Sequence, residues 1–447
     1  MNDIEDLATF ITSLRGADEA VLKKLRLHVA DTLGAWIAAT GTEEGRALIA
    51  YREHLKRITG TSSPLDDIAL HCALTRSSEV DDIHIGSMIT AGSVVIPAAL
   101  CMVTGFQGCD PRGLTSAILA GYEAMIRMGR TIRGPEVLFR GIWASYFAAP
   151  FGAAAVAARL FNLNTQQTAH ALAHALTMSA PSVGGHETAS TARWWLFGQA
   201  VRKGVSAALA AQAGFTADVG IMRSRLLPEV FGIEPDLAAM AGAQDQPLAL
   251  SEVSFKPWCA ARQTMAATQA FREVLAGGLS PDRITAIEAF VVPLHLKMID
   301  QGIHRGDRGS YFKSLPYQMA IAALQPQSRF DVGPSEELLT GPVMDFMKRV
   351  TVKADQNLMG PYPREWRARI VVETVDGERE HAVAAVPGDP SRPMPASELE
   401  SKFNRLAAAA GLQAVERLWS VGLGLLDAIA EPHAVDPFSL PPAANSF

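Results

Sequence analysis

The stretch "ARIVVETVDGEREHAVAAV", residues 368–386, decides the fold class. Two runs of strand-forming residues flank Asp376-Gly377, a dipeptide that favours a tight turn between antiparallel strands. Two further runs, 284–293 ("ITAIEAFVVP") and 349–355 ("RVTVKAD"), also have strand character, and the first stops at a proline. A small sheet is therefore expected late in the chain, with a helix between its strands at about 315–324.

The chain on both sides of this region predicts helices. Apolar residues recur every three or four positions from Leu22 to Trp36, which gives one apolar stripe, and Asp18 is a plausible N-cap before it. Asn164 with Gln167, and Ser397 with Glu400, resemble capping boxes that begin helices. Further helices rich in small residues are expected at 113–128, 149–161, 165–179 and 198–213.

These patterns predict a fold that is mainly α with an inserted α+β domain. The large all-helical domain would comprise residues 1–253 and 396–447. The smaller α+β domain would comprise residues 254–395. A length of 447 residues with 48% hydrophobic and 19% charged residues fits more than one buried core.

Composition also limits the partners. A net charge of -6 without a basic block gives no reason to expect nucleic-acid binding. The four cysteines lack paired metal spacing, which indicates reduced thiols in a cytoplasmic protein. The start, "MNDIEDLATF", is acidic and amphipathic and does not resemble a signal peptide.

One uncharged run, residues 85–109, is long enough to span a bilayer. Gly86, Gly92, Pro97 and Gly105 interrupt it, and no basic residues flank it. We therefore interpret the run as a buried loop followed by a core helix, and we expect no association with a membrane.

Several polar groups could carry chemistry. Asp81, Asp82 and His84 lie directly before the uncharged run, where a desolvated acid or base could work; a solvated loop or a helix N-cap is the alternative. His170 and His174 have a spacing that suits zinc, but no third ligand is apparent, so structural histidines and no metal are expected.

The segment "SVGGHETASTARWW" lacks nucleotide-binding spacing, yet it gathers His186, Glu187 and Arg193 between helices. Farther along, "FKPWCAARQ" contains Lys256, Cys259 and Arg262. Cys259 has no identifiable histidine partner, so an inert thiol is the better interpretation. Lys256 could be a desolvated base. Lys256, Arg193 and Arg262 could each hold a carboxylate.

The order of segments resembles the MmgE/PrpD family, which includes 2-methylcitrate dehydratase, cis-aconitate decarboxylase and iminodisuccinate epimerase. The resemblance runs along nearly the whole chain. Its landmarks are "EVDDIH" followed by "AGSVVIPAAL" (79–100), "GYEAMIRMGR" (121–130), "GIWASYFAAPFGAAAVAARLFNLN" (141–164), "TARWWLFGQAVRKGVSAALAAQAGFT" (191–216), "FKPWCAARQ" (255–263), "SLPYQMAIAAL" (314–324) and Lys402-Phe403.

The resemblance implies a homodimer without metal or organic cofactor, with an active site in the cleft between a helical domain and a lid. It also implies proton abstraction next to a carboxylate, followed by loss of water or CO2 or by reprotonation. Lys256 matches the family's lysine at the domain junction, Tyr317 its lid tyrosine, and Asp81 and Asp82 its acidic pair.

This chain departs from the family pattern at several positions. Thr90-Ala91 replaces a His-Pro pair. Trp143 replaces a histidine, and Ala261 replaces a residue that is a cysteine or a histidine in the family. Arg193 replaces a lysine and keeps its charge. Glu79 stands where the family has an aspartate, and Arg76 stands where it has a histidine. Trp143 would make the pocket more apolar and suit a substrate with fewer carboxylates.

The resemblance therefore implies a cofactor-independent lyase, a dehydratase or decarboxylase, that acts on a small carboxylate. The alternatives are an isomerase or epimerase on the same scaffold, and a non-catalytic homodimer that binds a carboxylate. The predicted catalytic residues are Lys256, His84, Asp81 and Tyr317. The predicted substrate-binding residues are Arg193, Arg262, Asp82, Trp143 and Thr90.

Overall fold

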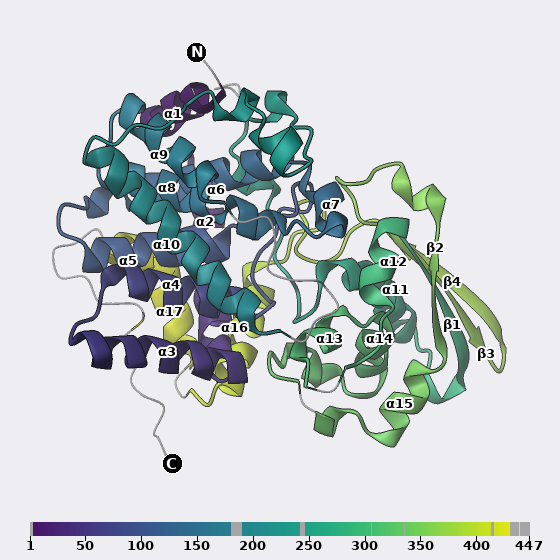
Figure 1. Ribbon diagram of the computed structural model, residues 1–447. Helices are drawn as coiled ribbons and strands as arrows, with labels where there is room; N and C mark the ends of the chain where they lie inside the picture. The colour runs from purple at the N-terminus through teal and green to yellow at the C-terminus, as the bar shows by residue number, and fades with distance from the viewer. Residues whose placement is uncertain are drawn as a thin grey trace. The chain divides into compact units, whose positions relative to one another are not determined.

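The computed structural model describes residues 3–179, 190–241, 246–304, 306–334, 336–412, 415–429 and Phe438. Figure 1 labels its helices and strands. The described residues form two compact units. The larger unit contains residues 3–179, Thr191–Val253 and the described residues from Leu399 onward, and the smaller unit contains Ser190 and Ser254–Glu398.

The larger unit is built from helices. They are α1 (Asp3–Ser13), α2 (Glu19–Thr40), α3 (Glu43–Thr59), α4 (Pro64–Ser77), α5 (Gly92–Gly105), α6 (Leu114–Thr131), α7 (Gly134–Val137), α8 (Ala144–Leu160), α9 (Thr165–Thr177), α10 (Ala192–Gln212), α16 (Ala396–Ala409, shared with the end of the smaller unit) and α17 (Val415–Ile429). Helix α8 packs between α6 and α10, and α10 also packs on α4 (Figure 1).

Small residues let these helices approach closely. A Cβ at Gly204 of α10 would lie 2.1 Å from the Pro150 carbonyl oxygen of α8. Two predicted helix starts are confirmed: the Asp18 side chain caps α2, and Asn164 with Gln167 forms a capping box at α9. The predicted box at Ser397 is wrong, because α16 already begins at Ala396 and Ser397 lies inside its first turn.

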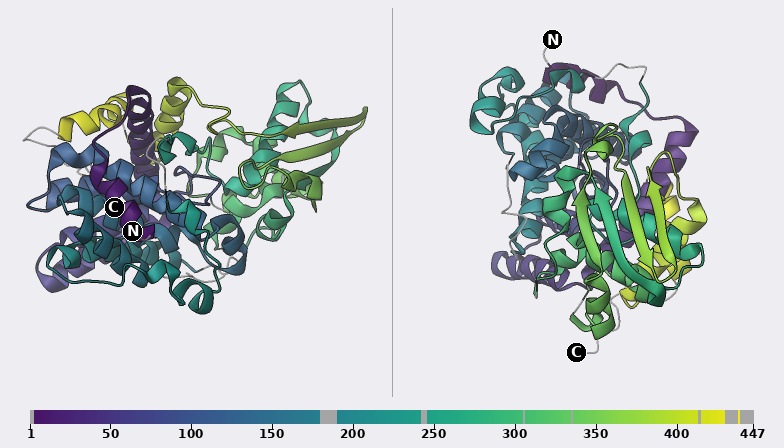
Figure 2. Two further views of the ribbon diagram at one scale, coloured as in Figure 1. Left: turned by 90° about the horizontal axis from the view of Figure 1, so that it is seen from above. Right: turned by 90° about the vertical axis from the view of Figure 1, so that its right-hand side faces the viewer.

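The smaller unit holds a four-stranded mixed sheet in the order β2-β1-β3-β4. Its strands are β1 (Ile284–Val291), β2 (Val350–Ala354), β3 (Ala368–Thr374) and β4 (Gly377–Val383), and only the pair β1–β2 is parallel. Its helices are α11 (Arg262–Ala276), α12 (Pro293–Ile299), α13 (Arg308–Lys313), α14 (Leu315–Leu324) and α15 (Gly341–Met347). Helices α11 and α14 pack against one face of the sheet (Figure 2).

The predicted hairpin is present, with its turn one residue earlier than expected. Thr374 pairs with Gly377, so Val375 and Asp376 form the two-residue loop. Gly377 takes φ 128°, which glycine adopts without strain. A sheet-bearing segment thus interrupts a helical unit, and this confirms the predicted fold class, mainly α with an inserted α+β domain.

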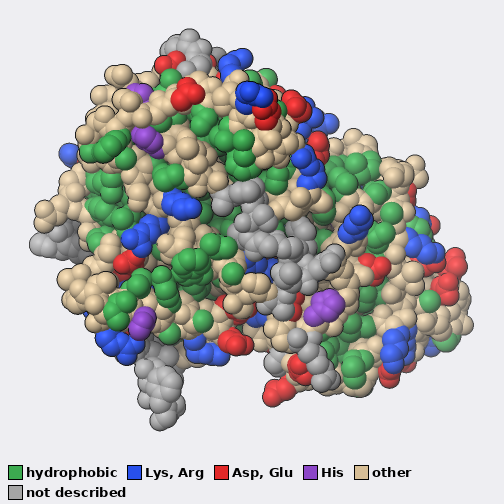
Figure 3. Space-filling model, in the orientation of Figure 1, with side chains coloured by type: hydrophobic (Ala, Val, Ile, Leu, Met, Phe, Trp, Pro, Cys, Tyr) green, Lys and Arg blue, Asp and Glu red, His purple; other side chains and the backbone are tan. Residues whose placement is uncertain are grey.

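The uncharged run at 85–109 forms a buried loop and the core helix α5, as predicted. Among the described residues, no helix combines the length and apolar character that crossing a bilayer requires. On the face shown in Figure 3, basic and acidic side chains are interspersed, and the basic ones do not gather in one patch.

Candidate active site

The loop between α4 and α5 carries Asp81, Asp82 and His84, and all three side chains are buried. His84 and Ile89 pair as an antiparallel bridge, which closes the loop on itself. Glu79 and Met88 take positive φ values of 58° and 59°, which non-glycine residues seldom adopt. Strain of this kind concentrates at functional sites. Because the side chains of Asp81, Asp82 and His84 are buried, the solvated-loop alternative is wrong for this segment.

Asp82 is enclosed by partners from the same unit. Its Oδ2 accepts a hydrogen bond from the Tyr122 hydroxyl (2.6 Å) and lies 2.9 Å from His28 Nδ1, while Oδ1 accepts from the Gly92 backbone N–H (2.9 Å). Burial alone would raise the pKa of Asp82, but these hydrogen bonds lower it. The geometry fixes the loop onto α2, α5 and α6.

A second buried pair attaches the returning helix α16 to the same region. Lys402 Nζ lies 2.7 Å from Asp31 Oδ1 and donates to the Val80 carbonyl oxygen (3.1 Å). Burial raises the pKa of Asp31, and the positive charge of Lys402 opposes that shift. Val80 directly precedes Asp81, so Lys402 helps to position the candidate carboxylate.

His84 is held through both ring nitrogens. Nδ1 accepts the Ser87 backbone N–H (3.1 Å) and lies 2.7 Å from the Ser87 hydroxyl, while Nε2 lies 3.3 Å from Glu252 Oε2. Arg130 Nη2 lies 3.2 Å from Nε2 and donates to Glu252 (2.7 Å). Burial lowers the pKa of His84. The ring is therefore neutral, and we assign its proton to Nε2, facing Glu252.

A cationic cluster forms where α4, α8 and α10 meet. The guanidinium carbons of Arg76 and Arg193 lie 5.7 and 4.6 Å from the centre of the Trp194 ring. Arg76 Nη1 contacts Asp81 Oδ1 (3.2 Å) and Glu79 Oε2 (3.3 Å). Arg193 is buried at the start of α10. Two guanidinium groups around one indole form a favourable place for an anion.

Aromatic residues line this cluster. Trp143 directly precedes α8, and its ring contacts that of Tyr146 edge-on at 5.8 Å. Thr90 lies far from Trp143 and Tyr146 in the sequence. Its hydroxyl and backbone N–H nevertheless both donate to Ser145 Oγ (3.1 and 3.0 Å). Thr90 thus joins the α4–α5 loop to the start of α8.

The remaining predicted residues lie in the smaller unit. Lys256 is 2% exposed, and the neighbouring Phe255 N–H donates to the Gly388 carbonyl oxygen (3.0 Å). Arg262 Nη2 donates to both oxygens of Asp389 (2.9 and 2.7 Å). Burial raises the pKa of Tyr317, which keeps it a phenol that can donate a hydrogen bond. Cys259 is buried.

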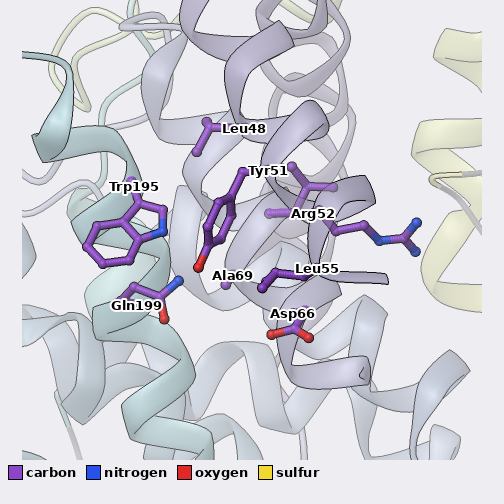
Figure 4. Close-up of a pocket in the computed structure, with 9 residues that line it drawn as sticks. Leu48, Tyr51, Arg52, Leu55, Asp66, Ala69, Trp195 and Gln199 are labelled. Atoms are coloured by element: carbon purple, nitrogen blue, oxygen red, sulfur yellow. The ribbon is translucent and has the colours of Figure 1, made fainter. Parts of the chain in front are cut away.

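Other features involve none of the predicted catalytic or substrate-binding residues. The hollow in Figure 4 is lined by apolar and polar side chains of α3, α4 and α10, including Tyr51 and Trp195, and by none of the predicted residues. His170 Nδ1 contacts Ala217. In the part of the chain that the structure describes, no three histidine, cysteine or acidic residues gather in a way that could hold a metal. His186 and Glu187 lie outside the described residues.

Sequence reasoning missed three contributors: Glu252, Arg130 and Tyr146. Arg130 lies inside the quoted landmark at residues 121–130, and that position could have marked it as a candidate site residue. Glu252 is 168 residues from His84 and no local pattern joins them. Tyr146 also lies inside a quoted landmark, residues 141–164, but nothing in that stretch marks its hydroxyl as a binding group.

Comparison with known families gives two matches. The model of the MmgE/PrpD N-terminal domain matches residues 5–225, and the model of the MmgE/PrpD C-terminal domain matches residues 258–421. No match to a curated protein was found.

Proposed function

Because the chain belongs to the MmgE/PrpD family, we propose that it is a cofactor-independent lyase, a dehydratase or decarboxylase, that acts on a small carboxylic acid. Family membership supports a lyase-type function in general. The observation that carries the finer proposal is the buried cluster of Arg76, Arg193 and Asp81 around Trp194.

The chemistry needs a base for a weakly acidic C–H and cations for the carboxylate beside it. In this proposal Arg193 holds the carboxylate, and Arg76, which contacts Asp81 and Glu79, adds positive charge beside it. Lys256 removes the proton from the adjacent carbon. Tyr317, a neutral phenol, donates a proton or hydrogen bond to the developing negative charge.

The remaining predicted residues receive supporting roles. His84 presents Nε2–H rather than a lone pair, so it acts as a donor and not as the base. Asp81 orients Arg76. Asp82 and Thr90 hold the loop, Trp143 provides an apolar wall, and Arg262 fixes the turn that carries Asp389.

The experiment is a panel of small hydroxy and unsaturated carboxylic acids, followed by proton NMR in D2O for loss of water or CO2. Lys256→Ala should abolish turnover without changing the melting temperature by more than a few degrees. Lys203→Ala, which changes an exposed lysine of α10, is the matched control and should retain turnover. Full turnover in Lys256→Ala would remove that residue from the mechanism.

The same experiment separates the alternatives. An isomerase or epimerase needs the same proton removal, and it would show deuterium uptake at the α-carbon without loss of water or CO2. The replacements at Thr90, Trp143 and Ala261 favour a non-catalytic carboxylate-binding homodimer as the second candidate. Saturable binding of an acid without deuterium uptake or product would support that candidate instead.

A further inference from the structure

One buried hydroxyl in the cationic cluster has no hydrogen-bond partner among the described residues. Tyr146 is 1% exposed on α8, and its hydroxyl oxygen neither donates to nor accepts from any group there. Burial raises the pKa of Tyr146, so the group is a phenol with a proton to donate. A buried donor without an acceptor weakens the folded state, and such groups in native proteins call for an explanation.

The ring of Tyr146 is fixed while its hydroxyl is not. Phe197 of α10 contacts the ring edge-on at 4.8 Å, and Trp143 contacts it at 5.8 Å. The positive charges of Arg76 and Arg193 lower the pKa of the hydroxyl, and the smaller effects of Glu79 and Asp81 raise it. The hydroxyl is therefore held in a field that favours an incoming anion.

We infer that the Tyr146 hydroxyl is a further substrate-binding group, which donates a hydrogen bond to the carboxylate that Arg193 holds, in an acid whose remaining body is apolar. This inference rests on the proposed function. A carboxylate has two oxygens, so one oxygen can accept from the Tyr146 hydroxyl while the other accepts from the Arg193 guanidinium. Asp81 and Glu79 already place two negative charges beside Arg76, so the cluster suits one further carboxylate rather than several.

Trp143 limits what the rest of the bound acid, beyond its carboxylate, can be. It stands 9% exposed beside Tyr146, and its indole forms an apolar wall against which a small alkyl group can pack. A second carboxylate against the indole would lose hydration, which costs free energy. The inferred ligand class is thus a small monocarboxylic acid with an alkyl substituent.

The test is calorimetric titration of the full chain with isobutyrate and with succinate. The wild type should bind isobutyrate more tightly than succinate. Tyr146→Phe keeps the ring and removes only the hydroxyl, so it should weaken isobutyrate binding roughly ten-fold or more, as expected for a hydrogen bond to a charged group.

Stability separates a ligand role from a packing role. Tyr146→Phe should leave the melting temperature unchanged or raise it, because an unsatisfied buried group is removed. Tyr122→Phe is the matched control: its hydroxyl donates to Asp82 (2.6 Å), so its loss should lower the melting temperature.

Each outcome has a clear reading. Wild-type affinity in Tyr146→Phe, together with lost binding in Arg193→Gln, would overturn this inference and leave the proposed carboxylate site in place. Wild-type affinity in Arg193→Gln would overturn both. Tighter binding of succinate than of isobutyrate, or no binding of either acid, would overturn the assigned ligand class.

Discussion

His71 of α4 is a half-buried histidine whose protonation opposes folding. Burial, aided by the nearby charge of Arg52, lowers its pKa from 6.5 to about 3, and its Nδ1 accepts the Trp36 indole N–H (3.0 Å). Because the folded-state pKa lies below the unfolded value, the folded state has its full stability above about pH 6.5. That stability is lost progressively as the pH falls from 6.5 toward 3.

His71→Asn should remove one proton from this acid response, because the amide oxygen can replace Nδ1 as acceptor and does not titrate. Between pH 6 and pH 4 the free energy of unfolding of the variant should fall less steeply, by about 1.4 kcal/mol per pH unit. Urea unfolding at several pH values measures this slope. An unchanged slope would show that His71 is protonated in the folded protein.

The acidic pair shows how far single residues can be predicted from sequence. The pair beside an uncharged run indicated a functional loop, but the two carboxylates have different roles. Asp81 faces Arg76, five residues away, whereas Asp82 faces Tyr122 and His28, each at least 40 residues away. Neighbouring residues point in different directions, and the distant partners that decide their roles leave no local pattern.

At the scale of the elements, glycines on helix faces set how closely α8 and α10 pack. Gly204→Ala would place a methyl group 2.1 Å from the Pro150 carbonyl oxygen. Because that oxygen belongs to the backbone, one of the two helices must shift to relieve the clash. We expect a loss of about 1–3 kcal/mol of unfolding free energy. Gly424→Ala in α17 is the control, since nothing lies within 4 Å of its new Cβ and it should stabilise by about 0.5–1 kcal/mol. Equal effects in urea unfolding would contradict the packing argument.

The Lys402–Asp31 pair joins α16 to α2 inside the larger unit. Lys402→Met should destabilise by about 3–5 kcal/mol, because it leaves Asp31 as a buried carboxylate without its counter-ion. Adding Asp31→Leu should recover much of this loss, since both charges are then gone. Urea unfolding of the two single variants and the double variant measures the coupling, and strictly additive losses would argue against it.

Most long elements could be predicted because their signals are local. Helix caps at Asp18 and Asn164 and the alternation in β3 depend on neighbours within a few residues. The short helices α12 and α13, and the parallel pairing of β1 with β2, were not predicted. The pairing joins Ile287 to Val350, and contacts at such separations depend on the whole fold rather than on local propensity.

At the scale of the whole molecule, the main part of the smaller unit, Ser254–Glu398, is one continuous segment with its own apolar core. Phe271, Ile287, Met319 and Ile370 belong to that core, and helices and sheet both contribute to it. The segment is also closed on itself near both ends, since the Phe255 N–H donates to the Gly388 carbonyl oxygen (3.0 Å). A domain with its own core and joined ends can fold independently.

We therefore expect residues 254–398, expressed alone, to fold with a cooperative thermal transition, followed by circular dichroism. Gly388→Val in the same fragment should weaken or abolish that transition. Gly388 takes φ 100°, which a β-branched residue cannot adopt without strain, and a Cβ there would lie 2.3 Å from the Phe255 carbonyl oxygen. A fragment that melts without cooperativity would mean that the smaller unit depends on the helical unit for its fold. An unaffected Gly388→Val fragment would mean that the closure near its ends contributes nothing to that fold.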